Sequence, residues 1–319
     1  MKHFQLLRSL LFEKLLHTEI PTEFGEFKKW ISSGKYIVRD IPSSKRIDIE
    51  INDEYAFCHM MAFDSCRMSA AAFETMHNIQ SVALLPKSFG WIAIQSYYAA
   101  FFSAHSIIRS FGYVCSQLEK GHITQLNNYA QAVGLSNSIK PEAGFFSGSF
   151  NSNSRILFLS KMKNTHEDTW STLIECLNEI SQNVLNVTGL SAHKQQVSAS
   201  ISDLIDRLTS RGKFAKGNFL SQFRNSVNYR HEHDSWHPYG KHSIKSEKIV
   251  SLLANWKSEN DLSMPIWKES LEVYNFFVAC REVINFNYLL IQLIIESSEK
   301  HKNLYTRWPA KLLNIISVA

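Results

Sequence analysis

An apolar stripe with the period of an α-helix runs through residues 90–111 and constrains the fold more than any other feature of the sequence. Small and large side chains alternate along it: Ala93, Tyr97, Ala100, Ala104, Ile107 and Phe111. Because small side chains let a second helix approach closely, the stripe predicts a buried helix inside a bundle. His105 lies on the same stretch and is predicted to be a packed or partly solvated histidine rather than a ligand.

The same periodicity predicts helices along most of the chain, and a content of only 12 Gly and 7 Pro supports this reading. The predicted helices cover about 4–18, 23–32, 54–76, 86–112, 116–133, 168–187, 200–209, 217–233, 244–256 and 266–299. An apolar run at 36–39 and a strictly alternating run at 46–51 flank Pro42-Ser43-Ser44, which predicts a β-hairpin. The expected fold class is mainly all-α: a helical bundle with a small β-hairpin near the N-terminus and inserted segments.

The composition indicates a folded globular protein, with 45% hydrophobic and 20% charged residues among 319. Five widely spaced cysteines without a C-x-x-C pair favour a reducing compartment and argue against a zinc ribbon or a disulfide framework. Arg8 and Glu13 interrupt the N-terminal apolar residues, so no signal peptide is expected. No run approaches a membrane span in length. The predicted location is the cytoplasm, with no membrane association.

The positive charge is concentrated in one part of the chain, although the net charge of +5 is modest. Residues 207–230 contain six cations and no carboxylate: Arg207, Arg211, Lys213, Lys216, Arg224 and Arg230. A local field of this kind attracts phosphate groups. The alternative is a solvated basic helix face whose acidic neighbours come from elsewhere in the sequence.

Within this stretch, Arg224 and His231 stand seven positions apart. On a helix, seven steps return to within roughly 20° of the starting direction, with Asn228 about 40° round on the same face. A fixed cation, an amide and a titratable imidazole on one stripe are the groups that a phosphodiester requires. Tyr229 would lie about 140° from Arg224 and is predicted to pack against the bundle. The alternative is an ordinary solvated pair at a helix end.

No metal or cofactor site is predicted. The sequence lacks the Gly-rich phosphate-binding motifs, the G-x-S-x-G nucleophile motif and the H-E-x-x-H zinc motif. Four histidines cluster at His231, His233, His237 and His242, but no cysteine is near and Pro238-Tyr239-Gly240 interrupts the group. An exposed, polar helix end is the expected structure here.

Two segments resemble the HEPN domain superfamily. The run Ser96–Ala104, with its Tyr-Tyr-Ala-Ala-Phe core, resembles the first-helix signature, and Arg224-Asn225 followed by His231 resembles the R-x(4–6)-H motif. Lys120-Gly121-His122 lies between them in the same order as in that superfamily. The resemblance implies an all-α bundle over 81–300, with insertions near 134–164 and 236–263. Residues 1–80 would be an extension for sensing or partner binding, and 301–319 a C-terminal tail.

Many proteins that this chain resembles are metal-independent endoribonucleases of toxin–antitoxin, abortive-infection and antiviral systems. The resemblance implies catalysis by His231, whose imidazole can take a 2′-hydroxyl proton near neutral pH, and by Arg224, whose permanent charge suits the phosphate oxygens. The products would be a 2′,3′-cyclic phosphate and a 5′-hydroxyl. The expected RNA-binding residues are Asn225, Asn228, Arg230, Lys213 and Lys216.

The resemblance also implies a homodimer through the Arg224–His231 helix and an antitoxin or sensor as partner protein. The alternative function is that of a non-catalytic HEPN-like module, which binds a nucleotide, a nucleic acid or a partner protein through the same basic face. The insertion at 134–164 is rich in Ser, Asn and Gly but contains apolar runs, so a short strand or hairpin is an option there.

Overall fold

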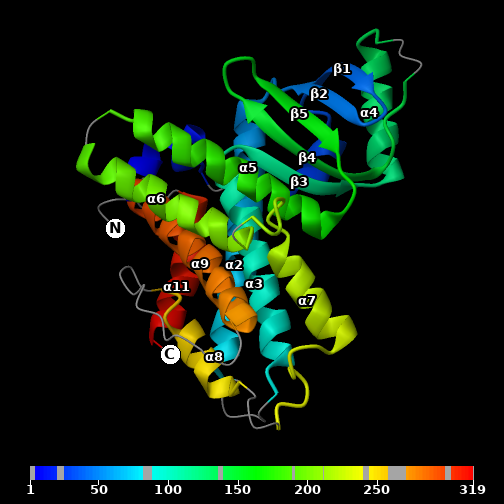
Figure 1. The fold of residues 1–319 in the computed structure, drawn as a ribbon. Helices are drawn as coiled ribbons and strands as arrows, with labels where there is room; N and C mark the ends of the chain where they lie inside the picture. The colour runs from blue at the N-terminus through cyan, green and yellow to red at the C-terminus, as the bar shows by residue number, and fades with distance from the viewer. Residues whose placement is uncertain are drawn as a thin grey trace.

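A bundle of helices carries a five-stranded antiparallel sheet at one end (Figure 1). The computed structural model describes residues 4–19, 25–81, 88–135, 139–188, 191–210, 212–239, 244–257, 271–298 and 303–318. Helices predominate throughout these ranges, which confirms the predicted mainly helical character.

The sheet is larger than the single hairpin that the sequence predicts. Its strands are β1 (Ile37–Ser43), β2 (Arg46–Glu50), β3 (Tyr113–Leu118), β4 (Gly144–Asn151) and β5 (Ile156–Lys161). They pair in the order β1-β2-β5-β4-β3. The predicted β1–β2 hairpin is confirmed, and the optional hairpin in the 134–164 insertion is present as β4 and β5.

Antiparallel pairing of β2 with β5 joins the N-terminal hairpin to the insertion, for example through Ile47 opposite Leu159. The predicted domain boundary at residue 80 therefore separates strands that belong to one sheet. A second difference lies at 116–118, which were predicted to begin a helix. There β3 pairs with β4, and α4 starts at Lys120. Both differences arise from backbone pairing between segments that are distant in the sequence. Helical periodicity gives no information about such pairing.

The helical part consists of two 3₁₀ segments and eleven α-helices among the described residues. Their bounds are η1 Phe4–Leu10, η2 Glu13–His17, α1 Phe27–Ser33, α2 Glu54–Ser81, α3 Gly90–Ser110, α4 Lys120–Ala132, α5 Thr165–Asn186, α6 Ser191–Leu208, α7 Phe219–Arg230, α8 Ser246–Ala254, α9 Leu271–Ser297, α10 Leu304–Arg307 and α11 Pro309–Val318. The sequence predicted a single helix at 4–18, whereas the structure has the two 3₁₀ segments η1 and η2 there. The predicted start of the last long helix near 266 lies outside the described residues.

The helix α3 occupies the centre of the bundle, where it packs against α2, α5, α7 and α9 (Figure 1). The predicted stripe is buried, since Ala93, Tyr97 and Ile107 have no solvent exposure. His105 is buried, and its Nε2 lies 3.5 Å from the hydroxyl of Thr169 on α5. The sequence pattern therefore located the central helix correctly.

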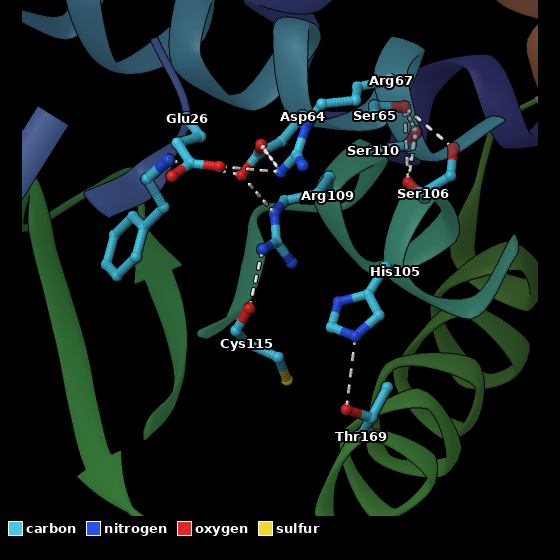
Figure 2. A network of polar contacts seen from close by, with 11 residues as sticks. Glu26, Asp64, Ser65, Arg67, His105, Ser106, Arg109, Ser110, Cys115 and Thr169 are labelled. Atoms are coloured by element: carbon cyan, nitrogen blue, oxygen red, sulfur yellow. Dashed lines mark hydrogen bonds and ion pairs between the residues drawn. The ribbon is translucent and has the colours of Figure 1, made fainter. Parts of the chain in front are cut away.

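Buried polar contacts fix α3 against α2 and against the sheet (Figure 2). The Asp64 carboxylate forms an ion pair with Arg109 at 3.4 Å, and both side chains are 2% exposed. Arg109 also donates to the backbone carbonyl of Cys115 in β3 at 2.8 Å. Nearby, the hydroxyls of Ser65 and Ser106 lie 3.0 Å apart across the same helix pair. These contacts align α3, and with it the residues Tyr97 and Tyr98.

Residues 303–318, assigned to a C-terminal tail by the sequence, contain α10 and α11, which pack against α2 and α9. The side chain of Asn303 donates to the carbonyls of Leu15 and Leu16, which attaches this end of the chain to η2. Among the described residues, α9 alone is long and apolar enough to cross a membrane. The apolar window of α9 is 72% buried inside the protein, which is the behaviour of a core helix.

Candidate functional site

The helix α7 carries most of the predicted site residues and packs against α3 and α9. Its inner face is aromatic and apolar, and the ring of Phe223 stacks on Phe276 of α9 with centroids 4.1 Å apart. Beyond the helix end, the indole N–H of Trp236 donates to the carbonyl of Val227 at 2.8 Å. The helix is therefore fixed at both its face and its C-terminal end, and its side chains have defined directions.

Arg224 points into the protein and is only 6% exposed. Its guanidinium carbon lies 5.0 Å from the centre of the Tyr97 ring and 5.9 Å from that of Tyr98. Among the described residues no carboxylate forms an ion pair with Arg224, and its Nε has no hydrogen-bond partner there. The two segments that carry the family resemblance thus meet in space, and they hold a buried cation against aromatic faces.

A histidine that the sequence analysis did not select completes this cluster. The hydroxyl of Tyr97 lies 2.9 Å from Nδ1 of His166, and the indole N–H of Trp170 donates to the same hydroxyl at 3.4 Å. His166 stands in the first turn of α5, where the side chain of Asn164 accepts from the His166 backbone N–H. The Asn164 cap is visible in the sequence, but nothing there connects His166 with Arg224.

The surroundings favour the neutral form of the His166 ring. Burial, followed by the positive charge of Arg224, lowers the pKa of His166 below its ordinary value. Burial also raises the pKa of Tyr97, and hydrogen bonding from Trp170 and the charge of Arg224 oppose that rise only in part. The cluster therefore combines one permanent cation, one neutral imidazole and one protonated phenol.

His231 does not occupy the helical stripe that the sequence predicts. α7 ends at Arg230, not near 233, and His231 is its C-cap in the left-handed conformation, with φ 54° and ψ 34°. Its backbone N–H donates to the carbonyl of Ser226, and its side chain is exposed. The predicted angle of about 20° from Arg224 assumes a continuous helix, so it does not apply. Arg224 is buried, whereas His231 faces solvent.

The remaining predicted residues of α7 differ in their exposure. Asn225 and Asn228 are partly buried, and Arg230 is exposed with its guanidinium 4.0 Å from the carboxylate of Glu232. The predicted packing of Tyr229 is wrong, since 70% of this residue is exposed. The inward face of α7 belongs to Phe219, Phe223 and Val227, and Tyr229 stands outside that arc.

The basic stretch gains acidic partners from other helices. Lys216 lies 3.5 Å from Glu167 of α5, and Arg207 lies 2.8 Å from Glu282 of α9. The ammonium group of Lys213 stands 5.4 Å from the ring of Phe214. Arg211 lies outside the described residues. The fold therefore neutralises part of the field that residues 207–230 suggest in the sequence, while Lys213 and Lys216 keep exposed side chains.

The downstream histidines have local structural contacts. The ring of His233 stacks on Phe223 with centroids 4.6 Å apart, and its Nε2 lies 3.0 Å from the hydroxyl of Ser226. His237 contacts Tyr239, while His242 lies outside the described residues. In the part of the chain that the structure describes, no three His, Cys, Asp or Glu side chains are grouped so as to hold a metal ion. His122, from the Lys-Gly-His segment, caps the first turn of α4.

The geometry thus offers two sets of groups: a buried Arg224–Tyr97–His166 cluster between α3, α5 and α7, and an exposed His231 at the end of α7. The cluster can bind an anion, and the exposed imidazole can exchange a proton with a bound molecule. Comparison of the chain with protein-family models, with curated proteins and with solved structures gives no match.

Proposed function

We propose that this protein is a metal-independent endoribonuclease of the HEPN type that acts in toxin–antitoxin or antiviral defence. The observation that carries the proposal is the position of Arg224, a buried cation that lacks a carboxylate among the described residues and lies against Tyr97 and Tyr98. Buried charges in proteins are normally paired. An RNA phosphate would supply the missing negative charge.

In the proposed reaction, neutral His231 takes the proton of a ribose 2′-hydroxyl, and the 2′-oxygen attacks the adjacent phosphorus. The P–O5′ bond breaks, the 5′-oxygen leaves with a proton, and the products are a 2′,3′-cyclic phosphate and a 5′-hydroxyl. Arg224 stabilises the charge that develops on the phosphate oxygens. Its planar, permanently charged group suits this role better than lysine.

The supporting contacts to RNA would come from the exposed cations and amides around α7. Lys213, Lys216 and Arg230 are exposed, as backbone contacts require, and Asn225 and Asn228 are partly exposed on α7. Such cations add affinity that falls as salt concentration rises. Because His231 and Tyr229 are exposed at the same end of α7, we include a homodimer through this helix in the proposal. The partner's imidazole would then protonate the leaving oxygen.

A cleavage assay with purified protein and single-stranded RNA in buffer with EDTA tests the proposal. The parent is expected to produce 2′,3′-cyclic phosphate ends, and Arg224→Met and His231→Ala are each expected to lower the rate at least roughly a hundredfold. Tyr239→Phe, which changes an exposed residue outside the proposed site, serves as the control. If both site variants cleave as fast as the parent without metal, the proposal is wrong.

The second candidate function is a non-catalytic HEPN-like module, which binds a nucleotide, a nucleic acid or a protein such as an antitoxin or sensor. It is favoured by the burial of Arg224 and by the outward position of His231, which leave the two groups in different environments. RNA binding without cleavage, lost in Arg224→Met and retained in His231→Ala, would support this function in place of the first.

A further inference from the structure

The cluster around Arg224 contains a buried hydrogen-bond donor that has no acceptor among the described residues. The guanidinium can only donate, and its buried Nε has no partner among the described residues. The indole N–H of Trp170 can also only donate, and it is directed to the hydroxyl oxygen of Tyr97. A buried cationic donor that lacks an acceptor among the described residues is suited to an oxyanion.

The hydrogen bonds of Tyr97 are linked to the tautomer of His166. Trp170 and Arg224 can only donate to the Tyr97 oxygen, so the hydroxyl hydrogen of Tyr97 goes either to Nδ1 of His166, 2.9 Å away, or to the hydroxyl of Ser221, which also hydrogen-bonds Tyr97. An Nδ1 that accepts this bond leaves the proton of the neutral ring on Nε2. In that arrangement His166 presents an N–H donor on the side of the ring opposite Tyr97.

We propose that the Nε2–H of His166 and the guanidinium of Arg224 together bind a phosphodiester oxygen of RNA, and that Tyr97 is the positioning residue that holds His166 in the required tautomer. The RNA nature of this ligand rests on the proposed function, whereas the donor arrangement is independent of it. The inference adds a binding residue from α5, at the boundary of the inserted segment, to a site that the sequence placed on α7 alone.

A bound phosphodiester would change the protonation of His166. The charged and titratable groups around the ring are Arg224 of α7 and Tyr97, Tyr98 and His105 of α3, while Glu167, its neighbour on α5, pairs with Lys216. Without ligand, burial and Arg224 favour the neutral ring. A phosphodiester anion favours the protonated ring, in which Nε2–H still faces the anion and Nδ1–H donates to the Tyr97 oxygen, so binding takes up a proton. Affinity is therefore expected to rise as pH falls from 8 to 6.

A 2′-O-methyl oligouridylate is a suitable probe, because it lacks the 2′-hydroxyl nucleophile and its phosphodiesters do not titrate in this range. Binding would be followed by fluorescence anisotropy between pH 6 and pH 8. The parent is expected to bind the probe at least about threefold more tightly at pH 6 than at pH 8. His166→Ala is expected to bind roughly tenfold more weakly at pH 6 and to lose most of the pH dependence. His17→Ala, at an exposed histidine of η2, is the matched control and should behave as the parent.

Long-range ¹H–¹⁵N NMR of the parent and of Tyr97→Phe tests the role of Tyr97. The expected spectrum shows the Nε2–H tautomer of His166 in the free protein and a rise in its pKa on addition of the probe. Tyr97→Phe should keep an aromatic ring under Arg224 but should show a mixture of the two His166 tautomers. His166→Gln should keep a hydrogen-bond donor but lose the pH dependence of probe binding.

The subsite is excluded if His166→Ala and His166→Gln bind the probe with the affinity and pH dependence of the parent, or if the parent does not bind it at any pH. Because the probe cannot be cleaved, the result is independent of catalysis. His166-dependent binding by a protein that leaves RNA intact would retain the subsite and reject the nuclease. If the protein cleaves RNA but neither His166 variant changes binding of the probe, the nuclease is retained and the subsite is rejected.

Discussion

The guanidinium of Arg224 lies over the ring of Tyr97, with the guanidinium carbon 5.0 Å from the ring centre, although the two residues are 127 positions apart in the sequence. This contact connects α7 to α3 and fixes the direction of Arg224, the buried cation of the predicted motif. An aromatic face stabilises a desolvated cation by about 2 kcal/mol but does not neutralise it. The charge of Arg224 therefore remains available to an anion.

The first prediction separates the packing of Arg224 from its charge. Arg224→Met keeps an unbranched side chain against Tyr97, and we expect the free energy of unfolding to change by no more than about 1 kcal/mol, because the buried guanidinium lacks a carboxylate partner among the described residues. Arg224→Ala should be less stable than Arg224→Met by about 2 kcal/mol, through lost packing. Urea denaturation measures both. If Arg224→Met is as unstable as Arg224→Ala, the charge of Arg224 itself stabilises the fold.

The second prediction concerns the buried ion pair between Asp64 and Arg109. Asp64→Asn leaves the Arg109 charge buried without its counter-ion and is expected to destabilise the protein by about 3–5 kcal/mol. Arg67→Gln removes the other, more exposed partner of Asp64 and should change stability by less than about 1 kcal/mol. Equal effects of the two variants in chemical denaturation would contradict the assignment of Arg109 as the structural partner.

The third prediction is a pH dependence of stability from Glu282 on α9. Burial raises the pKa of this carboxyl to about 7, although Arg207 and Arg281 oppose the rise. The folded protein therefore binds more protons than the unfolded chain between about pH 4.5 and pH 7, and this group's contribution to stability falls as pH rises through that window. Glu282→Gln should gain stability relative to the parent between pH 5 and pH 8. Denaturation curves at both pH values check the sign, and a constant difference would refute it.

The fourth prediction compares two glycines. A Cβ at Gly148 in β4 would clash with the backbone carbonyl oxygen of Phe158, so Gly148→Ala must displace β5 and is expected to cost about 1–3 kcal/mol. A Cβ at Gly121 in α4 would meet nothing within 4 Å, and Gly121→Ala is expected to stabilise the protein by up to about 1 kcal/mol. Thermal denaturation of the two variants should shift the Tm in opposite directions.

Local periodicity predicted the parts of the fold that form within a single segment of the chain. The stripe of α3 and the hairpin of β1 and β2 follow from residue spacing, because a helix or a hairpin forms its backbone hydrogen bonds within one segment. β3 was missed, and β4 and β5 were left open, because their pairing joins segments that are separated in the sequence: β3 pairs with β4, and β5 pairs with β2 across more than a hundred residues. No strand alone shows which partner it has.

The candidate site divides in the same way. The sequence by itself identified Arg224 and the Tyr97-Tyr98 pair, since their residue types and spacing resemble a known motif. Only the tertiary structure decided that Arg224 is buried against Tyr97, that His166 joins it from α5, and that His231 leaves the helix in a left-handed cap. The physical reason is that burial, charge pairing and proton position depend on which segments pack together. Those neighbours are set by the fold of the whole chain and not by the spacing of residues within one helix.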